Sequence, residues 1–165
     1  MPDRPDFRLD DLSTFESIQK MLAAHAKVTG MQSSIVDLFD GRVLAGAGWQ
    51  DICTRFHRAH PVSRQRCIQS DTMFSGEVRE IQAHEYTCRN GLQHVGIPII
   101  VDGSHLGTLF LGQFFYEHLG KDRDFFMCQA QELGFDLGEY LEALENVPVF
   151  SREHVQDILE YNLAF

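Results

Sequence analysis

Three cysteines, Cys53, Cys67 and Cys88, are the side chains of this sequence best suited to chemistry. Three thiolates that met in space would favour zinc, copper(I) or an iron–sulfur cluster, because soft sulfur ligands select such metals. None of the three belongs to a CxxC pair, the spacing typical of zinc ribbons and thioredoxin-like sites. The same thiols could instead contact a ligand or fill the core, since free cysteine is among the most buried residue types. The residues alone leave these three interpretations open.

A fourth cysteine, Cys128, is predicted to pack in the core, and disulfides are not expected in a domain of this size. A cysteine paired with one of the eight histidines would suit a thiol-dependent enzyme. The sequence, however, holds no nucleophile elbow, HExxH motif or glycine-rich phosphate loop. We therefore predict that the chain is not an enzyme, keep the thiol-dependent enzyme as an alternative, and identify no cofactor.

The composition is typical of a single soluble domain. The chain has 165 residues, of which 44% are hydrophobic and 23% are charged. The apolar run at residues 97–101 stops at Asp102-Gly103 and is far too short to span a membrane. Residues 1–6 lack the basic and apolar regions of a secretory signal. These features predict a cytoplasmic protein without membrane contact.

The net charge of −10 argues against a nucleic-acid surface, because neutralising phosphates requires clustered Lys and Arg. One segment departs from this acidic average, since residues 52–70 contain no carboxylate. Its basic and imidazole side chains are Arg55, His57, Arg58, His60, Arg64 and Arg66. A solvated helix face and an anion site would both explain this segment.

Local patterns predict the elements that must position these residues. Ser13 and Glu16 have capping-box spacing at the start of a first helix, which Gly30 ends. Asp40-Gly41 between residues 34–39 and 42–44 predicts a hairpin. Residues 50–82 are predicted to be helical in two pieces, the first ending near residue 60 and the second capped by Ser63. The inner face of the second helix would hold Cys67, Ser70 or Asp71, Phe74 and Val78.

The second half predicts a meander of strands at residues 85–89, 92–101 and 105–116, separated by Asn90-Gly91 and Asp102-Gly103. Pro98 then belongs at a bulge or an edge position. Helices follow at residues 122–133, 137–145 and from Ser151 onwards. The economical packing is an α+β fold, a five-stranded antiparallel sheet with helices over one face, of PAS- or GAF-like topology.

Several segments resemble the PocR-type sensory domain: RQRCIQSD at residues 64–71, CRNGL at 88–92, IPIIVDGSHLG at 97–107 with Gly112-Gln113, and VPVFS at 147–151. The resemblance covers residues 12–165. It implies an N-terminal tail at residues 1–11 and a single sensory domain at 12–165, whose last helix leads to an output module. Cys53, Cys67 and Cys88 match the three cysteine positions of the family, whereas Arg89 stands where many members have His.

Domains that the sequence resembles in this way have PAS-like folds and sit at the input end of transcription regulators, histidine kinases and cyclic-dinucleotide enzymes. They are thought to sense small organic molecules of the hydrocarbon-derivative type. The resemblance therefore implies a non-catalytic sensory domain that signals through its terminal helices to a regulator or kinase output. A metal or redox sensor built on Cys53, Cys67 and Cys88 is the alternative function.

A ligand cavity between sheet and helices needs apolar walls and a few polar groups that fix orientation. The polar candidates are Asp71, Arg89 and Gln113, although Asp71 could instead satisfy backbone groups of its own helix. The predicted ligand-binding residues are Phe56, Cys67, Asp71, Cys88, Arg89, Gln113 and Phe115.

Apolar stripes on the first and last helices are predicted to need burial, either against each other or across a homodimer. The stripes are Leu12, Phe15 and Ile18 on the first helix and Val155, Ile158 and Leu159 on the last.

Overall fold

The computed structural model describes residues 8–12, 15–39, 41–73 and 81–164, without the side chains of Asp10 and Leu12. Its helices are α1 (Leu9–Leu12), α2 (Phe15–Thr29), the π-helix η1 (Ile52–His57), α3 (Pro61–Asp71), α4 (Arg123–Leu133), α5 (Leu137–Glu145) and α6 (Arg152–Leu163). Its strands are β1 (Gln32–Asp37), β2 (Val43–Ala47), β3 (His84–Thr87), β4 (Gln93–Val101), β5 (Ser104–Tyr116) and β6 (Val149–Phe150). The predicted roles of Ser13, Phe74, Val78 and the Leu12 side chain lie outside the described residues.

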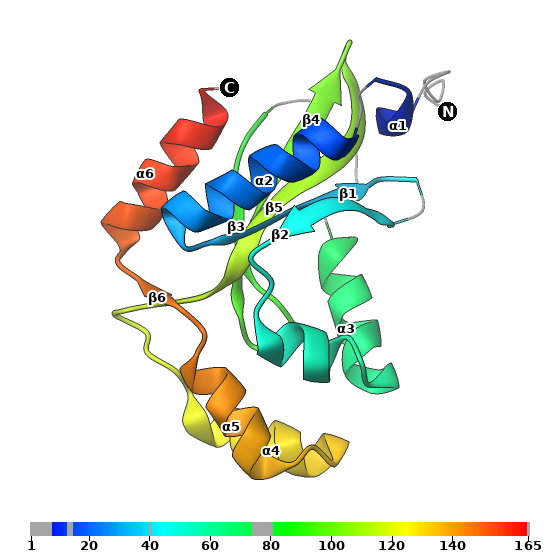
Figure 1. Ribbon diagram of the computed structural model, residues 1–165. Coiled ribbons are helices and arrows are strands. Elements are labelled where there is room, and N and C mark those ends of the chain that lie inside the picture. Colours follow the sequence, from blue (N-terminus) through cyan, green and yellow to red (C-terminus); the bar gives the residue numbers. More distant parts are fainter. Residues whose placement is uncertain (1–7, 13–14, 40, 74–80, 165) are drawn as a thin grey trace.

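The sheet confirms the predicted fold class. Five antiparallel strands follow the order β2-β1-β5-β4-β3, and the short β6 pairs with β5 in parallel (Figure 1). The predicted Asp-Gly hairpin joins β1 to β2, and the predicted meander forms β3, β4 and β5. Pro98 lies beyond the last residue of β4 that pairs with β3, so its missing N–H leaves no gap in that ladder.

The C-terminal helices begin within one residue of the predicted ranges, and α4 and α5 end at the predicted residues. Asp122, Asp136 and Ser151 accept the backbone N–H three residues ahead, at Phe125, Glu139 and His154 respectively. Gly134 ends α4 in the left-handed conformation with φ 70°. Local side-chain and backbone preferences therefore determine where these three helices begin and where α4 ends.

The region of η1 and α3 departs from its prediction in three ways. The segment predicted as an ordinary helix is π-helical, with the Arg58 N–H donating to the carbonyl of Cys53 at 2.8 Å. The N-cap of α3 is His60 rather than Ser63, because Pro61 occupies the first turn and the Ser63 hydroxyl instead donates to the carbonyl of His57. Helix α3 ends at Asp71, so it does not continue to residue 82.

Helices cover both faces of the sheet, where one covered face was predicted. Alternate strand residues, such as Ile35 and Leu111, face α2 and α6, and their neighbours Ser34 and Phe110 face η1 and α3. Of the predicted stripes, Val155, Ile158 and Leu159 of α6 pack on the sheet, and Phe15 and Ile18 of α2 are partly buried against the cluster that contains Leu22 and Ile35.

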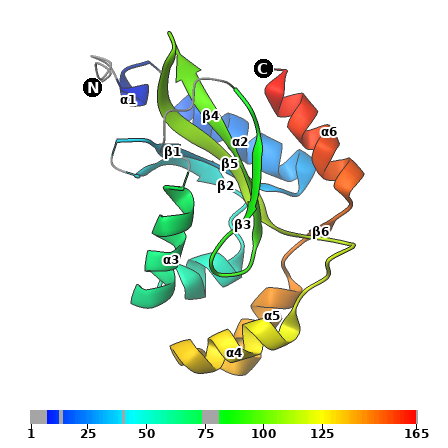
Figure 2. The ribbon, with the colours of Figure 1, turned by 180° about the vertical axis from the view of Figure 1, so that it is seen from behind.

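Helices α4 and α5 form a hairpin at the end of the molecule away from α2 (Figures 1 and 2). A core cluster joins them to η1 and β5 through Phe56, Phe115, Phe126 and Tyr140. Contrary to prediction, Cys128 of α4 is exposed.

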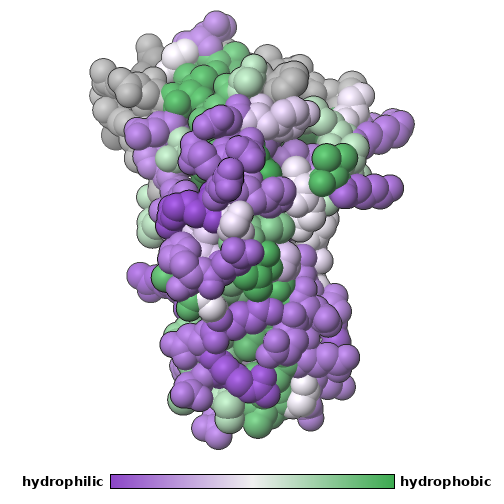
Figure 3. Space-filling view, turned by 90° about the vertical axis from the view of Figure 1, so that its left-hand side faces the viewer, coloured by the Kyte–Doolittle hydropathy of each residue, from purple (hydrophilic) through white to green (hydrophobic). Residues whose placement is uncertain are grey.

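No helix of the described residues is long and apolar enough to cross a membrane. On the face that carries α6, hydrophilic residues predominate and apolar residues form separate small patches (Figure 3).

Candidate ligand-binding pocket

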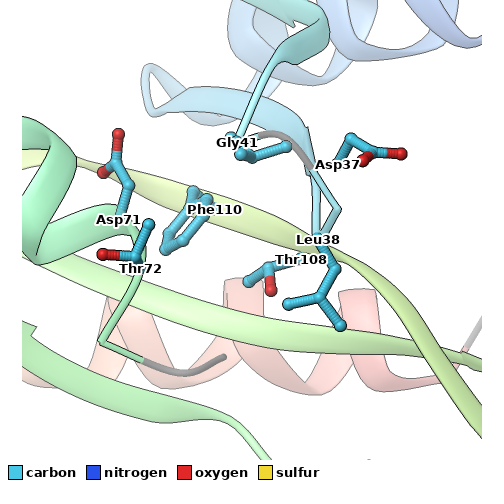
Figure 4. Close-up of a pocket in the computed structure, with 8 residues that line it drawn as sticks. Asp37, Leu38, Gly41, Asp71, Thr72, Thr108 and Phe110 are labelled. Carbon is cyan, nitrogen blue, oxygen red and sulfur yellow. The ribbon is translucent and has the colours of Figure 1, made fainter. Parts of the chain in front are cut away.

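Two small adjoining cavities lie between the sheet and the helices η1 and α3. The inner one offers about 10 Å³ to the centre of a water molecule and is lined by Gln32, Ser34, Val36, Trp49, Arg58, Asp71, His94, Phe110 and Gln113. The outer one offers about 20 Å³ and opens between the end of α3 and the β1–β2 turn (Figure 4). Val36, Asp71 and Phe110 line both cavities. Each has room for only about one or two water molecules.

Gln113 enters the inner cavity because of a β-bulge. Between Gly112, which pairs with His94, and Phe114, which pairs with Gln93, it is an extra residue of β5. Its φ of 59° is in the left-handed region, which residues other than glycine rarely adopt. Without the bulge, strand alternation would aim position 113 at the α6 side with Leu111. The strained backbone is thus what aims this amide at the cavity.

The two glutamine amides of the pocket differ in how they are satisfied. Gln113, 1% exposed, accepts a hydrogen bond at Oε1 from the N–H of Gln50 at 2.6 Å. Gln32, also 1% exposed, has no hydrogen-bond partner for its Nε2. An unpaired buried donor costs about 1–3 kcal/mol, so a partner that enters the cavity would be favoured there.

Arg58 and Asp71 form an ion pair at the boundary of the two cavities. The guanidinium donates to Asp71 Oδ2 at 3.0 Å and lies 5.1 Å from the ring centre of Trp49. Burial raises the pKa of Asp71, and Arg58 partly offsets this effect. The pair therefore leaves the pocket wall without an uncompensated charge.

His94 lines the pocket, and its ring stacks on Tyr86, which lines neither cavity. Their rings stack at 5.4 Å, and burial lowers the pKa of His94 to about 3, so the imidazole is neutral. The ring lies directly over Gly112, where a Cβ would collide with Nδ1. On the facing wall, a Cβ at Gly46 would come within 2.9 Å of the Trp49 ring. These close approaches require glycine at both positions.

The three cysteines lie near one another behind the pocket, and each is held separately. Asn90 Nδ2 donates to Cys67 Sγ at 3.2 Å, and the Leu92 N–H donates to Cys88 Sγ at 3.4 Å. Cys53 is part of η1 and packs in the core. In the described part of the chain, no three His, Cys, Asp or Glu side chains are grouped to hold a metal ion. Burial raises the pKa of all three thiols, that of Cys88 to about 11, which disfavours the thiolates that metals and nucleophilic chemistry require.

Of the predicted ligand-binding residues, the structure brings Asp71 and Gln113 together at the cavity. Phe56 and Phe115 pack in the core cluster below it, and Cys67 and Cys88 lie outside both cavity linings. Arg89 is exposed and donates to Gln69 Oε1 at 2.7 Å.

Sequence reasoning missed Gln32, Ser34 and Arg58 as pocket residues. The polar positions at alternate sites of β1 look like a solvent face, yet all six residues of β1 are buried. The basic segment also has a structural explanation, since Arg55, Arg58 and Arg66 pair with Glu139, Asp71 and Glu132.

A family model described as "Sensory domain found in PocR" matches residues 11–165. In the same comparisons, no curated protein and no solved structure matches the chain.

Proposed function

The chain belongs to the family of PocR sensory domains, and on this premise we propose that it binds a small organic molecule between the sheet and the helices η1 and α3. Binding then changes the signal that α6 passes to an output domain or kinase. In this proposal the domain is cytoplasmic, does no catalysis and contacts no nucleic acid.

The observation that carries the proposal is that Gln32, which lines the inner cavity, has a buried Nε2 without a hydrogen-bond partner. Beside it, Gln113 is held in a strained backbone conformation that points its amide into the same space. Backbone strain concentrates at functional sites, where the surrounding structure maintains it. Two buried amides that meet at one cavity suit a ligand with an acceptor oxygen.

The charges of the pocket favour an uncharged ligand. Asp71 compensates Arg58, and His94 is neutral because its pKa is lowered to about 3. An ionised ligand would lose its hydration without meeting a free counter-charge, which is costly in a buried site. Trp49 and Phe110 supply the apolar contacts that such pockets use.

The cavities are smaller than any organic ligand, so binding must move protein groups. Val36, Asp71 and Phe110 separate the two cavities, and their displacement would merge the cavities into one site. A ligand shifts a conformational equilibrium only by binding one state more tightly than the other. A pocket that is closed without ligand provides those two states.

The test begins with protein purified under native conditions and then denatured, so that mass spectrometry identifies any small molecule it releases. The recovered compound is titrated into ligand-free protein while the fluorescence of Trp49, the single tryptophan, is followed. Gln32→Leu should weaken binding by about tenfold, the loss expected for one hydrogen bond. Gln156→Leu, the same change on the exposed face of α6, should leave affinity unchanged. Equal affinity of the Gln32 and Gln156 variants would contradict the proposal.

A further inference from the structure

Helix η1 is held at both ends by side chains of the pocket. At its start, the side-chain oxygen Oε1 of Gln113 accepts a hydrogen bond from the backbone N–H of Gln50. The backbone carbonyl of Gln50 in turn accepts from the N–H of Cys53 at 3.0 Å. At its end, Arg58 is bound to Asp71 of α3. A molecule that took either contact in the pocket would therefore release one end of η1.

The other side of η1 enters a buried polar network with α4 and α5. His57 Nε2 lies 2.7 Å from the hydroxyl of Tyr140, and Gln129 Nε2 donates to the same hydroxyl at 2.6 Å. All three side chains are at most 3% exposed. Burial lowers the pKa of His57 to about 3, so the ring is neutral, and its Nε2 shares a hydrogen bond with the hydroxyl of Tyr140.

Gln129 also connects the α4–α5 hairpin to α3. Its Oε1 accepts from Arg66 at 3.2 Å, and its Nε2 lies within 3.3 Å of the Asn90 carbonyl. One amide thus contacts η1 through His57, the neighbour of Arg58, and contacts α3, the helix of Asp71, through Arg66. Because buried amides with several partners tolerate little displacement, relative movement of η1 and α3 must break contacts at Gln129.

The α4–α5 hairpin is joined directly to the last helix. The N–H of Phe115 donates to the Pro148 carbonyl at 2.9 Å and that of Glu117 to the Phe150 carbonyl at 3.0 Å, which fixes β6 between α5 and α6. Ser151 then caps α6. Only residues 146–151 therefore separate the end of α5 from the start of α6.

We propose that the His57–Tyr140–Gln129 network couples occupancy of the pocket to the α4–α5 hairpin, and through β6 to α6. The inference rests on the proposed function and names its regulation. The ligand competes for the Gln113 or Arg58 contact, η1 shifts, and the network carries the shift into α5. Tyr140 is a positioning residue in this scheme, since it touches no atom of the cavity.

The test needs no ligand, because a substitution can mimic release of η1. Gln113→Gly removes the side-chain oxygen that accepts from the Gln50 N–H. Glycine adopts a φ of 59° without strain, so the bulge itself is kept. Hydrogen exchange of the α5 amides should then quicken by about fivefold or more, with the amides of α2 unchanged. Tyr140→Phe keeps the ring in the core and removes the hydroxyl shared by His57 and Gln129.

In the double variant, Gln113→Gly should still quicken exchange in η1, whereas its added effect on α5 should fall below about twofold, because coupled sites are non-additive. The proposal would be overturned if Gln113→Gly increased the exchange rate of the α5 amides by the same factor with Tyr140 and with Tyr140→Phe. It would also be overturned if Gln113→Gly alone left the α5 exchange rate unchanged. Leu109→Ala, on the opposite face of β5, controls for global destabilisation and should change all amides alike. Since no ligand takes part, failure of this coupling is distinct from failure of ligand binding.

Discussion

The two faces of the central sheet are built from the same strands with opposite physical character. Toward α2 and α6, the alternate residues Ile35, Val95 and Leu111 pack in apolar cores. Toward η1 and α3, their neighbours include Gln32, Ser34 and His94, which surround small cavities. One face is filled mainly by apolar side chains, and the other holds an ion pair, an unpaired amide donor and a strained residue.

This difference shows how a small domain combines stability with a responsive site. Burying apolar side chains provides most of the free energy of folding, and the face toward α2 and α6 buries mainly such side chains. The pocket face is less stabilising, because it contains a strained backbone and a buried donor that lacks a hydrogen-bond partner. Substitutions on the two faces should therefore have opposite consequences for stability and for binding.

The largest expected effect is on the filled face. Leu111→Ala removes a fully buried side chain and should lower the free energy of unfolding by about 3 kcal/mol, from lost burial and the cavity that remains. Ser34→Ala, on the pocket face, should cost less than about 1 kcal/mol. Urea denaturation measures both. Similar losses from the two changes would contradict the contrast between the faces.

A second effect comes from the buried neutral histidines, His57 and His94. The pKa of each is lowered to about 3, below the 6.5 of an unfolded histidine, so the unfolded chain binds more protons below pH 6.5. Their contribution is complete above pH 6.5 and is lost as the pH falls toward 3. Each should approach a loss of about 1.4 kcal/mol per pH unit in this window.

His94 lines the pocket and His57 does not, so His94→Asn measures how much of this pH dependence comes from the pocket. The variant should reduce the slope of unfolding free energy against pH by the contribution of one histidine. Denaturation at a series of pH values between 6.5 and 4.5 measures the slopes. A variant with the wild-type slope would show that His94 is not held neutral by burial.

The sequence predicts the parts of the molecule that short-range signals determine. Asp122, Gly134 and Ser151 mark helix ends by their own hydrogen bonding and backbone preferences, and Asp40-Gly41 marks the hairpin, so these predictions agree with the structure. The fold class follows from the order of such elements.

The pocket depends on features that no local pattern reveals. The π-turn of η1 aims His57 and Arg58 in opposite directions, and the bulge at Gln113 reverses the alternation of β5. Gln32 is polar in a strand that is buried throughout, which only the packing of η1 and α3 explains. Gln113 was predicted as a polar group of the cavity, but the bulge that brings it there was not, and without the bulge strand alternation would place it on the opposite face.

A smaller effect tests the cysteines. Cys53→Ala, Cys67→Ala and Cys88→Ala should each lower the free energy of unfolding by about 1 kcal/mol, the cost of a lost buried sulfur, and leave ligand affinity intact. This follows because none of the three lines either cavity. Chemical denaturation and Trp49 fluorescence titration provide the two readouts. A single Cys→Ser change that removed bound metal from protein purified without oxygen would instead support the metal-sensor alternative.

The smallest expected change in stability is at Gln113, and it separates backbone strain from side-chain bonding. Gln113→Ala loses the hydrogen bond to Gln50 and keeps a strained φ of 59°, so it should cost about 1 kcal/mol. Gln113→Gly loses the same bond and relieves a strain of about 1 kcal/mol, so its stability should match the wild type within roughly 0.5 kcal/mol. Both variants should lose ligand binding, because both lack the amide. If glycine proved as destabilising as alanine in urea denaturation, the bulge would not be strained, and the pocket face would owe its lower stability to unpaired polar groups alone.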